Sequence, residues 1–340
     1  MNKKILIVGT INNFCLETSY AKAATGLGYE VQQFDPRSAT GKHIKFGKIG
    51  QKLHEFLPVE TWVRKMNREL VVMAKEHEPG TILLFGNAKI LYGTLITIKL
   101  ILPDCKIGWI WPDTPMNLES HVQQSAPFFD ISATYSKSTL EYYQALGFNN
   151  PRWIALAADN FMHYNPVPLQ DDFDCDISFV GMWRPERERV LKTIKDYFTD
   201  LKIEIHGYYW KRNCSDKDLL TYWKGTGFFA DGLGKFFSRS RININVIDDT
   251  NFPAANMRFF EIPVAGGLQV VSACPEMETE FKDGEHILYF KKEADVVEKI
   301  RWVLDNAAKA HQIRLAAQQL TLEKHTYTKR LTDILQFLKS

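Results

Sequence analysis

The sequence predicts an α/β protein with two doubly wound domains built on parallel sheets. Short apolar runs bounded by turn residues alternate with longer amphipathic stretches, which is typical of parallel strands covered by helices. This alternation starts at Lys4, is interrupted by a polar segment with two prolines between Leu156 and Asp172, and starts again at Asp176. With 340 residues, of which 45% are hydrophobic, the chain is long enough for two domains with separate cores.

The first half contains five expected strands and four expected helices, in alternating order for the most part. The expected strands are Lys4–Val8, Glu30–Phe34, Thr81–Phe85, Lys106–Trp111 and Ile131–Tyr135. The expected helices are Leu16–Leu27, Glu60–His77, Tyr92–Ile101 and Lys137–Ala145. Glycines follow the first and the last of these helices, as is common where a helix ends in a left-handed residue.

The second half repeats the pattern. The expected strands are Asp176–Val180, Lys202–His206, Ile242–Val246 and Leu268–Ser272, and the expected helices are Glu186–Tyr197, one that starts at Asn256, and Thr328–Lys339. We therefore predict a first domain over residues 1–160, a linker over 161–172, a second domain over 173–325 and a terminal helix over 326–340. Two such domains would leave a cleft of the kind in which small ligands bind.

Composition excludes several classes of protein. The net charge of +2 does not require a polyanionic partner, and no apolar run approaches the roughly 18 residues of a membrane helix. The chain enters its first strand without a signal peptide, so a cytoplasmic location is expected. Its five cysteines include no CxxC pair, which favours reduced thiols over a disulfide or a metal site.

Residues 41–70 form a basic segment with seven Lys or Arg residues against three Glu. Apolar side chains are interleaved with these charges, among them Phe46, Ile49, Leu53 and Phe56. Such a segment could contact an anionic membrane, a lipid-phosphate acceptor or DNA phosphates. A solvated helix whose apolar side packs on the domain explains the pattern equally well.

Two segments of the second half carry the candidate chemistry. In the stretch Asn256 to Ser272, Asn256 can cap a helix, and Arg258 and Glu261 lie three residues apart on one helix face. The glycine pair Gly266 and Gly267 would end that helix before a buried strand. The other segment is the loop at Gly181, where backbone amides and the positive end of the next helix favour phosphate. Arg184 and Arg187 lie within reach of that end, although Arg187 could instead pair with the neighbouring glutamates.

The stretch NMRFFEIPVAGGLQVVS resembles the donor-binding helix of GT-B glycosyltransferases, most closely the CgeB-type branch, related to spore maturation proteins. The segments DISFVGMWRPERERVL and HGYYW resemble further parts of that donor domain. The resemblance implies a GT-B fold: two Rossmann-like domains facing an interdomain cleft, with the C-terminal helix crossing back to the first domain. It also implies a nucleotide sugar, expected to be a UDP- or GDP-sugar, with its ribose held by Glu261 and its phosphates near Arg258. The sequence departs from the larger glycosyltransferase group at Ala254, where a second glutamate is expected, and Pro263 should kink or shorten the helix.

We accordingly expect a metal-independent transfer of sugar from a nucleotide diphosphate to a hydroxyl of a glycan, a protein or a modified nucleobase. No convincing DxD loop is present and no cofactor is expected, so cationic side chains must stabilise the leaving diphosphate. The expected donor-binding residues are Gly181, Arg184, Arg187, His206, Lys235, Asn256, Arg258, Glu261, Gly266 and Gly267.

The acceptor side is expected in the first domain. Asp113 follows an apolar strand between tryptophans and is the expected catalytic base, with Arg258 as the second catalytic residue, although Asp113 could simply cap a turn. Thr10, Asn12 and Asn13 are candidates for acceptor contacts. A sugar-nucleotide epimerase and a non-catalytic nucleotide-sugar-binding module remain as alternatives.

Overall fold

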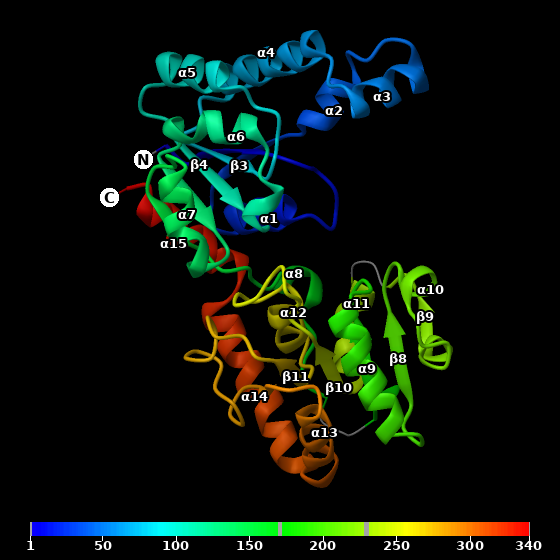
Figure 1. The fold of residues 1–340 in the computed structure, drawn as a ribbon. Helices are drawn as coiled ribbons and strands as arrows, with labels where there is room; N and C mark the ends of the chain where they lie inside the picture. Colours follow the sequence, from blue (N-terminus) through cyan, green and yellow to red (C-terminus); the bar gives the residue numbers. More distant parts are fainter. Residues whose placement is uncertain (1, 169–171, 228–230, 340) are drawn as a thin grey trace. The chain divides into compact units, whose positions relative to one another are not determined.

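The computed structural model describes residues 2–168, 172–227 and 231–339, and it divides into two compact units (Figure 1). Unit 1 comprises Met1–Ile154 and Thr328–Ser340, and unit 2 comprises Ala155–Tyr327. Most of the C-terminal helix α15 (Tyr327–Phe337) therefore belongs to unit 1. The segment expected to be a linker, residues 161–172, falls within unit 2 and overlaps the short helix α8 (Asn160–His163). Residues 169–171 lie outside the described residues.

Among the described residues, unit 1 contains a six-stranded sheet in the order β2-β1-β3-β4-β5-β6, with every pairing parallel. Its strands are β1 (Lys4–Val8), β2 (Glu30–Phe34), β3 (Thr81–Phe85), β4 (Lys106–Trp111), β5 (Ile131–Thr134) and β6 (Pro151–Trp153). Its helices are α1 (Leu16–Gly26), α2 (Pro36–Gly41), α3 (Gly47–Phe56), α4 (Glu60–His77), α5 (Tyr92–Ile101), α6 (Ser120–Ser125) and α7 (Leu140–Ala145). Short 3-10 turns lie at Pro115–Asn117, Ala126–Phe128 and Lys137–Thr139.

Continuous apolar strands explain the core of unit 1, because strands of a parallel sheet are covered on both faces. The four residues from Ile5 to Val8 are all fully buried, and Thr81–Phe85 is buried throughout. Trp109 lies at the centre of an aromatic cluster, with ring centroids 4.6 Å from Phe148 and 5.7 Å from Tyr143. Helices α4 and α5 lie side by side over one face of this sheet (Figure 1).

Unit 2 contains a second parallel sheet, which among the described residues has six strands in the order β12-β11-β10-β7-β8-β9. Its strands are β7 (Cys175–Val180), β8 (Ile203–His206), β9 (Trp223–Gly225), β10 (Ser240–Asn245), β11 (Gln269–Ser272) and β12 (Leu288–Phe290). Its other helices are α9 (Pro185–Tyr197), α10 (Trp210–Asn213), α11 (Asp231–Ser238), α12 (Arg258–Val264), α13 (Asp295–Asp305) and α14 (Ala307–Lys324), and a 3-10 turn spans Leu219–Tyr222.

The predicted fold class is confirmed, since each unit is a parallel sheet of the Rossmann type. Four expected strands and two expected helices of the first half have the predicted bounds. The elements that the sequence did not reveal are mostly short, such as β6, β9 and α10, or lack a clear apolar period, such as α14. Local patterning does not distinguish such segments from loops. No helix within the described ranges combines the length and the apolar character needed to cross a bilayer.

Candidate functional site

The strand order of unit 2 marks one place where a ligand is expected. Counting β7 as the first strand, this is the order of the doubly wound nucleotide-binding fold. Strands β7 and β10 are neighbours, and the chain continues from them to opposite sides of the sheet. Ligands of such sheets bind at the carboxyl ends of these two strands. The loops after Val180 and after Asn245 therefore frame the candidate site.

The loop after β7 is fixed to the end of the neighbouring strand β8. Gly181 N donates to His206 O at 2.9 Å, and Trp183 N donates to Tyr208 O at 2.9 Å. Gly207 makes this close approach feasible: its φ is +147°, and a Cβ atom there would lie 1.9 Å from Gly181 O. The backbone at Gly181 is thus held in place before any ligand binds.

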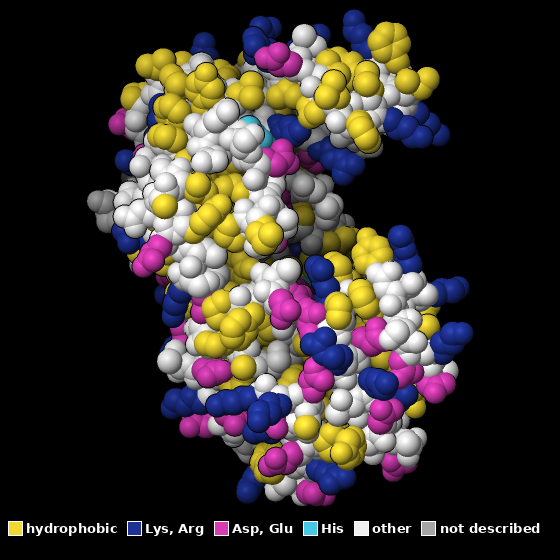
Figure 2. All heavy atoms as spheres, viewed as in Figure 1, with side chains coloured by type: hydrophobic (Ala, Val, Ile, Leu, Met, Phe, Trp, Pro, Cys, Tyr) yellow, Lys and Arg dark blue, Asp and Glu magenta, His cyan; other side chains and the backbone are white. Residues whose placement is uncertain are grey.

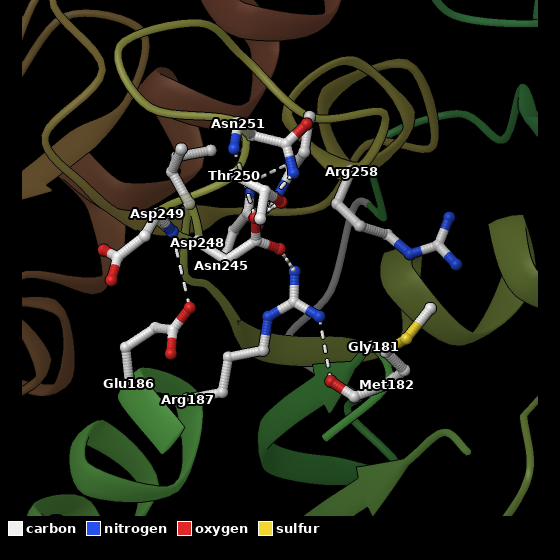
Figure 3. A network of polar contacts seen from close by, with 12 residues as sticks. Gly181, Met182, Glu186, Arg187, Asn245, Asp248, Asp249, Thr250, Asn251 and Arg258 are labelled. Atoms are coloured by element: carbon white, nitrogen blue, oxygen red, sulfur yellow. Dashed lines mark hydrogen bonds and ion pairs between the residues drawn. The ribbon is translucent and has the colours of Figure 1, made fainter. Parts of the chain in front are cut away.

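A buried ion pair joins the two loops of the site (Figure 3). Arg187 Nη2 lies 2.7 Å from Asp248 Oδ2, and Arg187 Nη1 donates to Met182 O at 2.8 Å. Asp248 Oδ1 accepts from Thr250 Oγ1 at 2.6 Å and from Asn251 Nδ2 at 2.7 Å. Burial raises the pKa of Asp248, but these hydrogen bonds and the charge of Arg187 outweigh it, so that the pKa lies below its ordinary value. Asp248 therefore stays ionised and holds Arg187 against the loop.

This arrangement changes the role expected for Arg187. The sequence suggested a phosphate contact or solvated pairs with neighbouring glutamates, whereas the structure pairs it with an aspartate 61 residues away. Burial lowers the pKa of the Arg187 guanidinium; Asp248 opposes this, and the charges of Arg184 and Arg258 lower it further. Three arginines thus converge on one loop, and the charge of Arg187 is already balanced inside the protein.

Helix α12 brings Arg258 and Glu261 to the same site. Arg258 Nε donates to Val180 O at 3.2 Å, and Arg258 Nη1 contacts Glu261 Oε2, so the two residues share a helix face as predicted. The Glu261 side chain is 4% exposed, against 31% for Arg258. Asn256 Oδ1 accepts from Phe259 N at 3.1 Å, which is the bond that a helix-capping residue makes. Glu261 therefore orients Arg258, whose guanidinium still reaches solvent.

Arg184 has the least engaged of the three guanidinium groups. It precedes α9 in an extended conformation, at the positive end of that helix. Its Nε atom is buried and has no hydrogen-bond partner among the described residues. By contrast Arg189, on the same helix, is bound through its Nε to Glu293 Oε1 at 2.6 Å. Arg184 is accordingly placed to receive an anion.

Three residues expected in the donor site are not joined to the Gly181 loop by any hydrogen bond or ion pair in the described part of the chain. Lys235 is exposed on α11, next to Phe236, whose ring lies 5.0 Å from the His206 ring. Gly266 and Gly267 precede β11 and permit close packing instead of contacting the Gly181 loop. A Cβ atom would lie 3.0 Å from the Val167 backbone at Gly266 and 2.8 Å from an Asn243 side-chain nitrogen at Gly267.

His206 and Asn256 have mainly structural surroundings. The His206 ring is buried and lies 5.0 Å from the Phe236 ring, and burial lowers its pKa, so the imidazole is neutral at pH 7. Asn256 exchanges side-chain hydrogen bonds with Asn245 at 2.8 and 3.0 Å. The His206 ring therefore packs on α11, and Asn256 ties the start of α12 to the end of β10.

Unit 1 has a pocket of about 510 Å³ beside the carboxyl ends of β1 and β3. Strands β2 and β3 lie on opposite sides of β1, so the pocket is at the point of this sheet where a ligand is expected. Thr10 lines it, and Thr10 N donates to Glu17 Oε1 at 2.8 Å. Glu17 is buried on α1, and burial, with a smaller contribution from Asp35, raises the pKa of its carboxyl group. A carboxylate with a raised pKa at the edge of a pocket is suited to accept a proton.

The other residues expected on the acceptor side do not line this pocket. Asp113 is exposed and accepts from Thr114 N at 2.7 Å and from Asn117 Nδ2 at 2.8 Å, as a turn-capping aspartate does. Asn12 and Asn13 are exposed in the loop after β1. Thr10 is thus the one expected acceptor residue that the structure brings to the pocket.

Sequence reasoning missed Glu17 and the partnership of Asp248. Glu17 lies in the first turn of a helix directly after a βα loop, where a carboxylate normally remains in water at the helix amino end. Only the packing of α1 on the sheet shows that it is buried. Asp248 accepts the hydrogen bonds of a turn, including one from Asn251 N at 3.2 Å, but its ion pair with Arg187 depends on strand order.

Residues 184–336 match the family described as glycosyl transferase-like. The chain is similar in structure to a glycosyltransferase from Rickettsia africae (TM-score 0.68, 12% identity, 99% of this chain and 97% of that chain). It is also similar to Anabaena HepE in complex with UDP (0.64, 12%, 99% and 99%) and to sucrose-phosphate synthase from Thermosynechococcus elongatus (0.64, 10%, 99% and 98%). No curated protein matches the sequence.

The matched region contains helix α12, the Arg187–Asp248 pair and Arg184, so the family match and the geometry point to the same part of the chain. At these identities the structural likeness establishes the fold. The chain therefore has the two-domain GT-B fold of glycosyltransferases, and its residues 184–336 carry the glycosyl transferase-like family match.

Proposed function

We propose that this protein transfers a sugar from a nucleotide diphosphate to an acceptor hydroxyl and that it is of the CgeB type. The observation that carries the proposal is the convergence of Arg184 and Arg258 on the Gly181 loop, where strand order places a ligand site. A departing nucleotide diphosphate concentrates negative charge, and arginine stabilises it through bidentate hydrogen bonds. The transfer needs no metal in this proposal: Arg184 supplies a positive charge without an acidic partner among the described residues, and Arg258, paired with Glu261, supplies further N–H donors to the phosphates.

UDP is the nucleotide that we propose first. The similar HepE structures contain UDP, UDP with glucose, or UDP-glucose, which supports a uridine nucleotide, with GDP as the alternative. The diphosphate would lie between Arg184 and Arg258. Glu261 would hold Arg258 in place and would also contact the ribose, as the family resemblance implies. The pocket of unit 1 is the proposed acceptor site, with Glu17 as the base for the acceptor hydroxyl.

Titration calorimetry with UDP and GDP tests the donor site. Charge-assisted hydrogen bonds are worth about 1.5–3 kcal/mol, so Arg184→Ala and Arg258→Ala should each weaken nucleotide affinity by about 10- to 150-fold. Arg189→Ala is the matched control, since it removes an arginine of the same helix that is bound to Glu293. Equal affinities for all three variants and the native protein would contradict the proposed donor site.

A panel of UDP-, GDP-, CMP- and TDP-sugars then separates the activities. A transferase releases the free nucleotide in the presence of an acceptor, an epimerase returns an isomeric sugar nucleotide, and a binding module leaves every donor unchanged. The second result would favour the epimerase alternative, and the third would remove catalysis from the proposal.

A further inference from the structure

Helix α3 of unit 1 carries an apolar face that the rest of unit 1 leaves exposed. Ile49, Leu53 and Phe56 recur at helical spacing and are 78%, 54% and 94% exposed. Phe46 directly before the helix and Leu57 directly after it are 82% and 70% exposed. Apolar side chains gathered on one exposed face mark an interaction surface.

The opposite face of the same helix packs on unit 1. Gly50 is buried, and a Cβ atom there would lie 1.8 Å from Lys45 O. Gln51 and His54 line the pocket described above, and the His54 ring lies 5.5 Å from the Trp62 ring. Because His54 contacts Trp62 of α4 on this side, the apolar face points away from α4.

Positive charge borders the apolar face. Lys45, Lys48 and Lys52 are exposed, and none of them forms an ion pair with a described side chain. Figure 2 shows hydrophobic side chains gathered over α3, with lysine and arginine side chains at their margin. This combination is typical of a helix that lies in the plane of a membrane interface.

We propose that α3 docks this protein on an anionic lipid bilayer, with its apolar side chains entering the acyl boundary and its lysines contacting lipid phosphates. Charge and shape favour this occupant over two others. A two-fold contact between copies of the chain would bring the lysines of both copies to the margin of one interface, where like charges repel. Nucleic acid would satisfy the lysines but would leave the apolar side chains against phosphates or water. The proposal is independent of sugar transfer.

Sedimentation of the full chain with vesicles tests the proposal. We expect binding to phosphatidylcholine vesicles that contain phosphatidylglycerol, weak binding to pure phosphatidylcholine, and a loss of binding as salt is raised. Ile49→Gln/Phe56→Gln should reduce binding by about tenfold or more, because exposed apolar groups no longer leave water. Lys48→Glu/Lys52→Glu should reduce it by a similar factor.

A matched control is Leu100→Gln/Met116→Gln, which removes two residues that are 76% and 91% exposed elsewhere in unit 1 and should leave vesicle binding unchanged. Melting temperatures of all variants show that each is folded. Absence of vesicle binding, or full binding by Ile49→Gln/Phe56→Gln, would overturn the proposal. Self-association that this variant abolishes, in the absence of vesicle binding, would assign the face to a second copy. DNA binding without vesicle binding would assign the lysines to a polyanion.

Discussion

Breaking the buried ion pair between Arg187 and Asp248 should lower the free energy of unfolding of unit 2. Arg187→Met removes the guanidinium and leaves a buried carboxylate that retains hydrogen bonds from Thr250 and Asn251. Breaking a buried pair costs about 3–5 kcal/mol, and the remaining hydrogen bonds place this case near the lower figure, about 3 kcal/mol. For a unit of this size, that corresponds to a melting temperature lower by about 6–12 °C.

Calorimetric melting of the full chain measures this effect, and Arg189→Met is the control. The Arg189 and Glu293 side chains are 58% and 44% exposed, so losing their pair should cost about 0–1 kcal/mol. Arg187→Met/Asp248→Asn should recover part of the loss, because no unpaired charge remains buried. If Arg187→Met melts no lower than Arg189→Met but binds UDP more weakly, Arg187 is a phosphate ligand and the reasoning is refuted.

Acidification gives an independent test of the same pair. The folded state lowers the pKa of Asp248, so the stability that it contributes is present above its unfolded pKa and is lost as the pH falls through the folded value. The difference in melting temperature between the native protein and Arg187→Met should therefore be largest near pH 7 and should narrow in acid. A difference that stays constant with pH would show that charge is not its source.

Two further predictions concern the pocket of unit 1 and the loop at Gly181. If Glu17 is the base, Glu17→Gln should slow transfer by about 10²–10⁴-fold with unchanged UDP affinity, and the native rate should rise with pH through the raised pKa of Glu17. Asp113→Asn should have little effect on the rate. A slow Asp113→Asn variant beside an active Glu17→Gln variant would restore Asp113 as the base. Gly207→Ala should destabilise unit 2 by about 2 kcal/mol or more in thermal melting, because its Cβ atom would overlap Gly181 O. Gly225→Ala is the control: its φ is also positive, at +133°, but its Cβ atom would meet open space, so only backbone strain should lower its stability. Equal losses of stability in the two variants would argue against the overlap at Gly207.

Features that depend only on residues close together in the sequence could be predicted from the sequence. Strands such as Thr81–Phe85 are apolar along their whole length because both faces of a parallel sheet are covered. Arg258 and Glu261 meet because their spacing is close to one helical turn, so their contact required no knowledge of the tertiary structure. The two-domain α/β architecture followed from the restart of the pattern.

The tertiary structure decided which charges remain available to a ligand. Strands β7 and β10 are neighbours in the sheet, although β8 and β9 lie between them in the sequence. This order brings Asp248 to Arg187, for which the sequence suggested phosphate or the neighbouring glutamates as partners. The packing of α1 buries Glu17, although its position in a first helical turn gives no sign of burial. Local propensities fix the period of an element but not its neighbours in the sheet, so pairings between distant segments appear only once the strands are ordered.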